Sequence, residues 1–103
     1  MSSSKGEDAD RVEVLNFTSP GNVTRVNAPR YKAVREVYLA ILPDALPGLT
    51  PAQILSAVAP RLPQDLFPGG DKAGWWCKCV QLDLEARGVI KRAETPPVRL
   101  IRV

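Results

Sequence analysis

Histidine is absent from the 103 residues of this chain, and other resources for chemistry are scarce. The two cysteines are too few to hold a zinc ion without histidine, because a structural zinc site takes about four such ligands. No glycine-rich phosphate loop follows a predicted strand, and no candidate nucleophile lies beside a base. We therefore expect no enzyme, no catalytic residue, no metal site and no cofactor.

Long hydrophobic runs are missing as well. The longest segment without a charged residue, residues 45–60, is interrupted by prolines and a glycine, whereas a membrane helix needs about 20 consecutive apolar residues. Residues 1–10 lack the apolar segment of a secretory signal. The sequence thus predicts no membrane partner and a cytoplasmic location.

The two cysteines, Cys77 and Cys79, lie two positions apart in a predicted helix. Residues at this spacing point to different sides of a helix, so a disulfide between them is unfavourable. We interpret both as small hydrophobic residues of the core.

What is present is the composition of an ordinary single domain. Hydrophobic residues make up 45% and charged residues 24% of the chain, as in typical globular proteins. The net charge of +3 is uneven: residues 1–13 hold two basic and four acidic residues, which leaves +5 for the rest. We expect residues 1–10 to be a disordered tail and residues 11–103 to be one domain with a basic surface that suits a polyanion.

The first third of the chain is typical of a β-hairpin followed by a helix. Two β-rich segments, residues 12–17 and 23–26, flank a Pro-Gly pair that suits a type II turn. Asn27 can cap a helix whose apolar residues recur at helical spacing until Pro43 ends it.

A short second helix is predicted to begin at Pro51, and Pro60 and Pro63 are expected to distort or end it. Thr50 and Gln53 have the spacing of a capping box, in which each side chain bonds the other's backbone N–H. In the loop that follows, Leu66 and Phe67 are the apolar side chains expected to pack back onto the core.

The third predicted helix runs from a cap at Asp71 to Gly88, which suits the left-handed closing position. Its first apolar stripe consists of Ala73, Cys77, Val80 and Leu84, and its polar face consists of Gly74, Lys78, Gln81 and Glu85. Asp83 and Arg87, four residues apart, can form an ion pair beside the apolar stripe.

Adjacent tryptophans, Trp75 and Trp76, lie in this helix and point about 100° apart. One is therefore expected in the core. The other is expected to contact the N-terminal hairpin or a second copy of the chain, which leaves a homodimer open.

The chain ends in a second predicted hairpin, residues 89–93 and 98–103. The order of parts, and residues 84–90 in particular, resemble a winged helix-turn-helix domain at the passage from recognition helix to wing. The Phe67-Pro68-Gly69-Gly70 loop and residues 72–76 resemble a small group of uncharacterised bacterial winged-helix proteins. The expected fold is α+β: a three-helix core, a C-terminal β-hairpin wing and an additional N-terminal β-hairpin.

The resemblance implies duplex DNA as partner and transcription regulation as the role, with the third helix in the major groove and the wing on the backbone. Lys78 and Gln81 would then read base edges. The phosphate contacts would be Lys72, Lys91 and Arg92, with Arg30 and Lys32 from the first helix.

Two features keep an alternative open. The loop between the second and third helices has roughly eight residues, longer than in a usual helix-turn-helix motif. Glu85 is also expected on the reading face, where it would repel phosphates. The alternative is a protein interaction or dimerisation module with the same fold and no DNA binding.

Overall fold

In the computed structural model, which describes residues 11–94 and 96–103, a β-hairpin comes first. Strand β1 (Arg11–Val14) pairs antiparallel with β2 (Thr24–Asn27), and Val12 lies opposite Val26. Val14 and Val26 are buried against the helices, so the predicted hairpin is confirmed. Residues 1–10, for which we expect a disordered tail, lie outside the described residues.

Three α-helices follow, α2 (Ala28–Ile41), α3 (Pro51–Val58) and α4 (Ala73–Ala86). The predicted caps of the first two helices are confirmed: the Asn27 side chain accepts the Arg30 N–H, and Thr50 and Gln53 form a complete capping box. The second helix is α-helical only to Val58. It tightens into the 3₁₀ turn η1 (Ala59–Arg61) at the proline there, because proline lacks the N–H that an α-helix would use.

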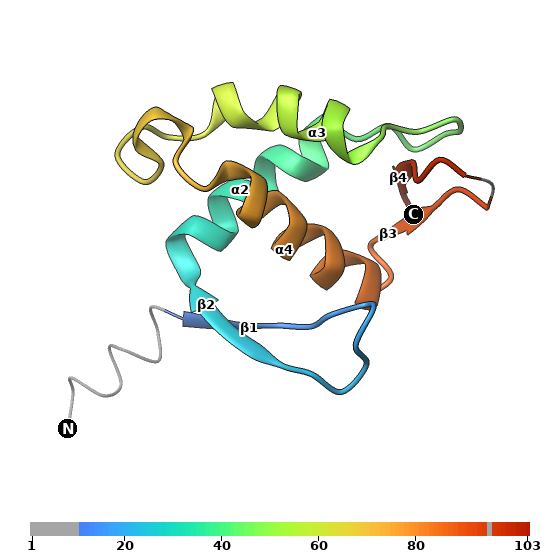
Figure 1. Ribbon diagram of the computed structural model, residues 1–103, viewed down its shortest axis with the longest axis horizontal. Coiled ribbons are helices and arrows are strands. Elements are labelled where there is room, and N and C mark those ends of the chain that lie inside the picture. Colours follow the sequence, from blue (N-terminus) through green and yellow to red (C-terminus); the bar gives the residue numbers. More distant parts are fainter. Residues whose placement is uncertain (1–10, 95) are drawn as a thin grey trace.

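Helix α4 is the central element of the structure. It packs against α2 and α3, and β1 also contacts it, so that in Figure 1 it lies between α3 above and the hairpin below. The predicted stripe of α4 is confirmed, since Ala73, Cys77, Val80 and Leu84 are all buried. The loop prediction is confirmed too, because Phe67 is buried and Leu66 is partly buried against the same core.

The start of α4 differs from the prediction. Asp71 does not cap the helix; the capping position is Lys72, which has a left-handed φ of 59° and no side-chain cap. A second 3₁₀ turn, η2 (Pro68–Gly70), holds the Asp71 N–H on the Pro68 carbonyl, so Asp71 belongs to this turn. The chain then enters α4 through the left-handed Lys72.

The C-terminal hairpin is also confirmed. Strands β3 (Ile90–Arg92) and β4 (Leu100–Arg102) pair antiparallel, after Gly88 has closed α4 with the expected left-handed φ of 75°. The segment before α3 adds a bridge to this hairpin: Leu49 and Leu100 exchange two backbone hydrogen bonds of 3.1 and 2.8 Å. The link between α2 and α3 is therefore attached to strand β4 of the C-terminal hairpin.

Across the described residues, no helix combines the length and the apolar composition that crossing a membrane requires.

Candidate functional site

The outward surface of α4 is mostly apolar. Within this helix, all of whose residues are described, the exposed positions are Gly74, Trp75, Lys78 and Ala86. Lys78 is thus the one exposed side chain of α4 with a charge, and Lys72, also exposed, precedes the helix. Cys79 and Leu82 are half-buried beside them.

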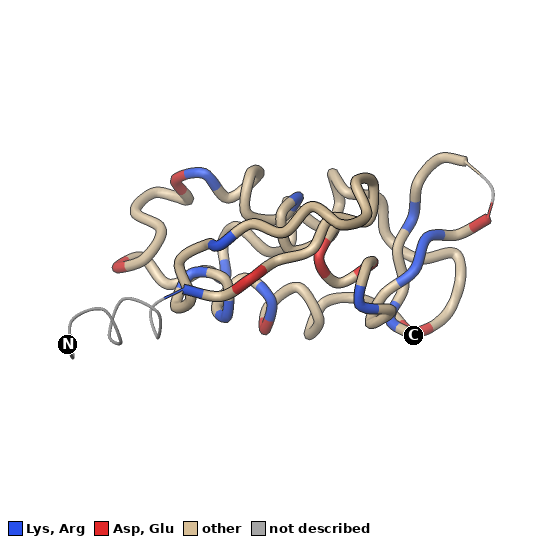
Figure 2. Tube along the Cα trace, turned by 90° about the horizontal axis from the view of Figure 1, so that it is seen from below, with Lys and Arg blue, Asp and Glu red and all other residues tan. Residues whose placement is uncertain are grey.

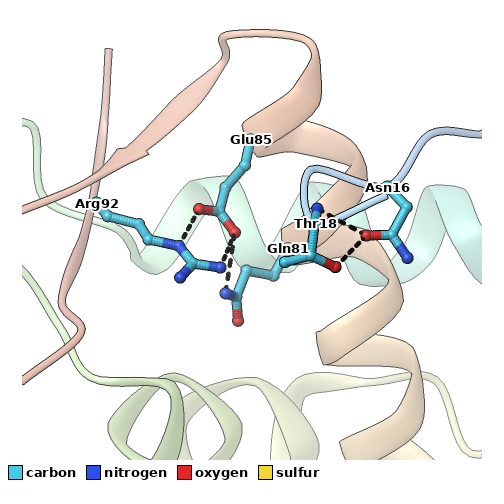
Figure 3. Close-up of polar contacts among 5 residues, drawn as sticks. All are labelled: Asn16, Thr18, Gln81, Glu85 and Arg92. Atoms are coloured by element: carbon cyan, nitrogen blue, oxygen red, sulfur yellow. Dashed lines mark hydrogen bonds and ion pairs between the residues drawn. The ribbon is translucent and has the colours of Figure 1, made fainter. Parts of the chain in front are cut away.

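Gln81 and Glu85 do not lie on an exposed polar face, contrary to expectation. Gln81 is only 2% and Glu85 only 6% exposed. The Gln81 amide donates to one carboxylate oxygen of Glu85 over 3.0 Å, and Arg92 from β3 donates to both oxygens of the same carboxylate (Figure 3). Gln81 is therefore unavailable to a base edge, and Glu85 is neutralised inside the fold.

Arg92 has a structural partner in place of the expected free phosphate contact. Its ion pair with the buried Glu85 raises the pKa of the guanidinium, chiefly through the hydrogen bond between them. The guanidinium carbon also lies 5.2 Å from the centre of the Phe17 ring. Arg92 thus connects the C-terminal hairpin, the end of α4 and the segment after β1. Its positive charge is largely balanced by the Glu85 carboxylate.

The C-terminal hairpin, β3 and β4, borders an open cleft of about 530 Å³. Its lining residues are Leu46, Pro47, Lys91, Arg92, Ala93, Glu94, Arg99 and Ile101. Both arms of the hairpin contribute cations, as Figure 2 shows at the C-terminal end of the molecule. Lys91 is exposed and Arg99 is half-buried, and neither has an ion-pair partner among the described residues.

Arg99 was missed by the sequence reasoning. The register of the predicted hairpin is the signal that could have placed Arg99 near Lys91. In the structure the Ala93 N–H bonds the Arg99 carbonyl, which sets Arg99 beside the end of β3. Arg30 and Lys32, in contrast, do not line the cleft. Both are exposed on α2, which passes behind α4 in Figure 1, and Arg30 donates to the Leu66 carbonyl over 3.1 Å.

Asp83 is a second carboxylate inside the fold, with no exposed surface. The predicted pair with Arg87 is confirmed at 2.9 Å. The same carboxylate also accepts the Leu15 N–H over 2.8 Å and the Tyr31 hydroxyl. Burial, together with this hydrogen bond, raises the pKa of Tyr31 to about 12. Asp83 therefore attaches the N-terminal hairpin and α2 to α4.

The two tryptophans divide as predicted, one inside and one outside. Trp76 is 6% exposed and meets Phe67 edge-on at 6.2 Å between ring centres. Trp75 is 57% exposed, and its ring stands edge-on to Trp76 at 5.1 Å. Trp75 lies beside the N-terminal hairpin, where it borders a hollow with Leu15 and Val26.

Both cysteines are free thiols, with Cys77 buried and Cys79 partly buried. Burial raises the pKa of each to about 11, so both remain protonated near neutral pH. The described residues contain no group of three or more histidine, cysteine, aspartate or glutamate side chains placed to hold a metal ion.

Residues 11–100 match a family of unknown function, DUF6958, and the chain belongs to that family. The match extends from the first residue of β1 to the first residue of β4, and so includes the N-terminal hairpin, helices α2, α3 and α4, and strand β3. No curated protein and no solved structure matches the chain.

Proposed function

We propose that this chain is a winged helix-turn-helix domain that binds duplex DNA, chiefly through phosphate contacts of its wing and of the start of α4. The order of elements supports the fold: a helix, a short bridged segment at Leu49, two further helices and a hairpin. In this arrangement α4 takes the place of the recognition helix and the β3–β4 hairpin takes the place of the wing.

The proposal rests chiefly on the basic cleft beside the β3–β4 hairpin. Lys91 and Arg99 project from the two arms of one hairpin into the same open cleft, whose only carboxylate among the described lining residues is Glu94. A phosphodiester backbone is a regular row of anions, and lysine and arginine supply most protein contacts to it. Lys72 and Lys78 add exposed cations at the start of α4.

Binding through phosphates with little base reading is the mode that the α4 surface favours. Direct readout needs exposed donors or acceptors on the helix that enters the major groove. With Gln81 and Glu85 buried, α4 offers Lys78 alone for that purpose. We therefore expect affinity that depends strongly on salt and weakly on sequence.

The test is the salt dependence of binding to duplexes of several sequences. Each lysine or arginine that neutralises a phosphate adds about −0.9 to the slope of log affinity against log salt, so four contacts give roughly −3 to −4. Replacing the two cleft cations that have no ion-pair partner among the described residues, Lys91→Ala with Arg99→Ala, should make the slope less steep by about two units for every sequence alike.

A matched control removes the same charge elsewhere. The double variant Arg11→Ala with Arg61→Ala takes two exposed cations from β1 and η1, outside the cleft, and should leave the slope unchanged. Equal slopes for the two double variants would refute a contact through the cleft. Absence of binding to every duplex at low salt would refute DNA binding altogether.

A further inference from the structure

An apolar groove runs between α4 and the N-terminal hairpin, away from the wing cleft. Two adjoining open hollows of about 210 and 360 Å³ form it, and Leu15 and Asn16 line both. Trp75 and Leu82 line the first hollow from α4, and Phe17 and Val23 line the second from the segment between β1 and β2.

The groove holds an unusual share of the exposed apolar surface. Trp75, Phe17 and Val23 are 57%, 48% and 49% exposed, and they account for half of the six large hydrophobic residues exposed among those described. Single exposed hydrophobic residues are ordinary, but a cluster around one groove indicates an interaction site. Trp75 is already ordered by its edge-on contact with Trp76, which lowers the entropy cost of binding there.

We propose that this groove binds an amphipathic helix with acidic flanks, from a partner protein. Its length along α4, from Trp75 to Ala86, is about 16 Å, or three helical turns. A helix of that length presents apolar side chains along one face to such a groove.

The charge of the groove selects an acidic partner. Lys78 is the only charged residue among the described residues that line either hollow. No carboxylate in the described part of the chain forms an ion pair with it. A second copy of the chain would bring two such lysines together without a carboxylate between them, so charge complementarity favours an acidic partner.

The test uses two synthetic peptides of about fourteen residues with leucines along one helical face. One carries glutamate and alanine at the other positions, and its counterpart has lysine in place of every glutamate. Neither contains tryptophan, so the emission of the protein reports binding. The acidic peptide should bind and move the emission to shorter wavelength as Trp75 leaves water, and the basic peptide should not.

Variants assign the effect to the groove. Trp75→Ala lacks the fluorescent reporter, so its binding is followed by isothermal titration calorimetry beside the native chain; it should bind the acidic peptide roughly tenfold or more weakly, as loss of a central aromatic contact does. Lys78→Glu should remove the preference for the acidic peptide, whereas Lys32→Glu, which changes the net charge equally on α2, should keep it. The cleft variant Lys91→Ala with Arg99→Ala should bind the peptide normally, because neither residue lines the groove, which separates this site from the phosphate contacts of the cleft.

Three results would overturn the proposal. Equal binding of the acidic and basic peptides would remove the charge argument, and unchanged binding by a folded Trp75→Ala variant would place the peptide elsewhere. Light scattering that shows a dimer in the native protein and a monomer in that variant would assign the groove to a second copy.

Discussion

At the scale of single residues, Asp83 connects several separate parts of the structure. Its carboxylate receives the Leu15 N–H, the Tyr31 hydroxyl and the Arg87 guanidinium, so it ties the hairpin and α2 to α4. Arg87 in turn donates to the Glu13 carbonyl over 3.0 Å, which adds a second bond to β1.

Replacement of Asp83 by asparagine should lower the free energy of unfolding by about 1 to 3 kcal/mol. The amide places an N–H donor against groups that are themselves donors, which leaves polar groups without partners in the interior. Arg87 is partly exposed and keeps its hydration, so the full cost of an unpaired buried ion is not expected. Urea unfolding measures the change; Glu36→Gln, at an exposed site on α2, should stay within about 0.5 kcal/mol.

Tyr31 makes the stability of the protein sensitive to alkali. Because its pKa is raised from 10.0 to about 12, the native state keeps the phenol proton in a range where the unfolded state has lost it. Below pH 10 both states hold the Tyr31 proton, so this group does not change stability there; the cysteines, whose pKa values are raised from 9.0 to about 11, begin to lower it about one pH unit earlier. Between about pH 10 and 12 stability should fall, since ionisation then favours the unfolded chain.

Denaturant unfolding at several alkaline pH values tests this expectation. Burial raises the pKa of Tyr38 as well, so tyrosinate absorbance should stay low until the protein unfolds. In Tyr31→Phe the decline of stability above pH 10 should be shallower than in the native chain. An equally steep decline in that variant would show that other groups cause it.

At the scale of elements, α4 has partners on several sides. Helices α2 and α3 and strands β1 and β3, one from each hairpin, all contact it. The stripe with Gln81 and Glu85 is polar in sequence yet buried, because Arg92 from β3 supplies its partner. Helix α4 therefore does not divide into one solvent-exposed polar face and one buried apolar face.

The β-bridge between Leu49 and Leu100 of strand β4 depends on Gly48. This glycine has a φ of +82°, and a Cβ there would lie 2.7 Å from the Leu100 carbonyl oxygen. Gly21 has a similar φ of +88°, but a Cβ at that position would meet nothing within 4 Å, so Gly21 isolates the backbone effect. Gly21→Ala should cost about 1 to 2 kcal/mol, for the left-handed conformation alone.

Gly48→Ala should cost roughly 1 to 3 kcal/mol more than Gly21→Ala, because it adds a clash with backbone that cannot rotate away. Urea unfolding of the two variants gives the difference directly. Equal losses would mean that the link before α3 moves freely relative to β4.

At the scale of the whole molecule, the N-terminal hairpin is part of the folded unit. Val14 and Val26 belong to the same buried cluster as the helices, and the Phe17 N–H bonds the Leu82 carbonyl over 3.2 Å. A chain that starts at residue 28 loses these contacts and one partner of Asp83. Its melting temperature should fall by roughly 12 °C or more, as expected for a loss of about 3 kcal/mol or more in a domain of this size.

A chain that starts at residue 11 is the matched truncation. Residues 1–10 are polar and charged with few apolar side chains, so their removal should leave the melting temperature almost unchanged. Thermal unfolding followed by circular dichroism compares the two truncations with the full chain. A similar loss in both would show that stabilising contacts begin before β1.

The sequence by itself determined the order and type of the elements. Asn27, Thr50 and Gln53 cap helices through bonds to residues three positions away, and Gly88 ends one through its own φ. These signals act within a few residues, so they do not depend on the rest of the fold. The buried stripe of α4 followed from helical periodicity for the same reason.

Only the tertiary structure decided which charges are free. Arg92 and Glu85 are seven residues apart, and Leu15 and Asp83 sixty-eight, so neither contact follows from local spacing. A buried carboxylate needs partners brought by other elements, and burial itself depends on how those elements pack. Hence Lys91 and Arg99 lie in the open cleft, whereas Gln81 is buried. For the same reason Trp75 lies outside the core that encloses Trp76.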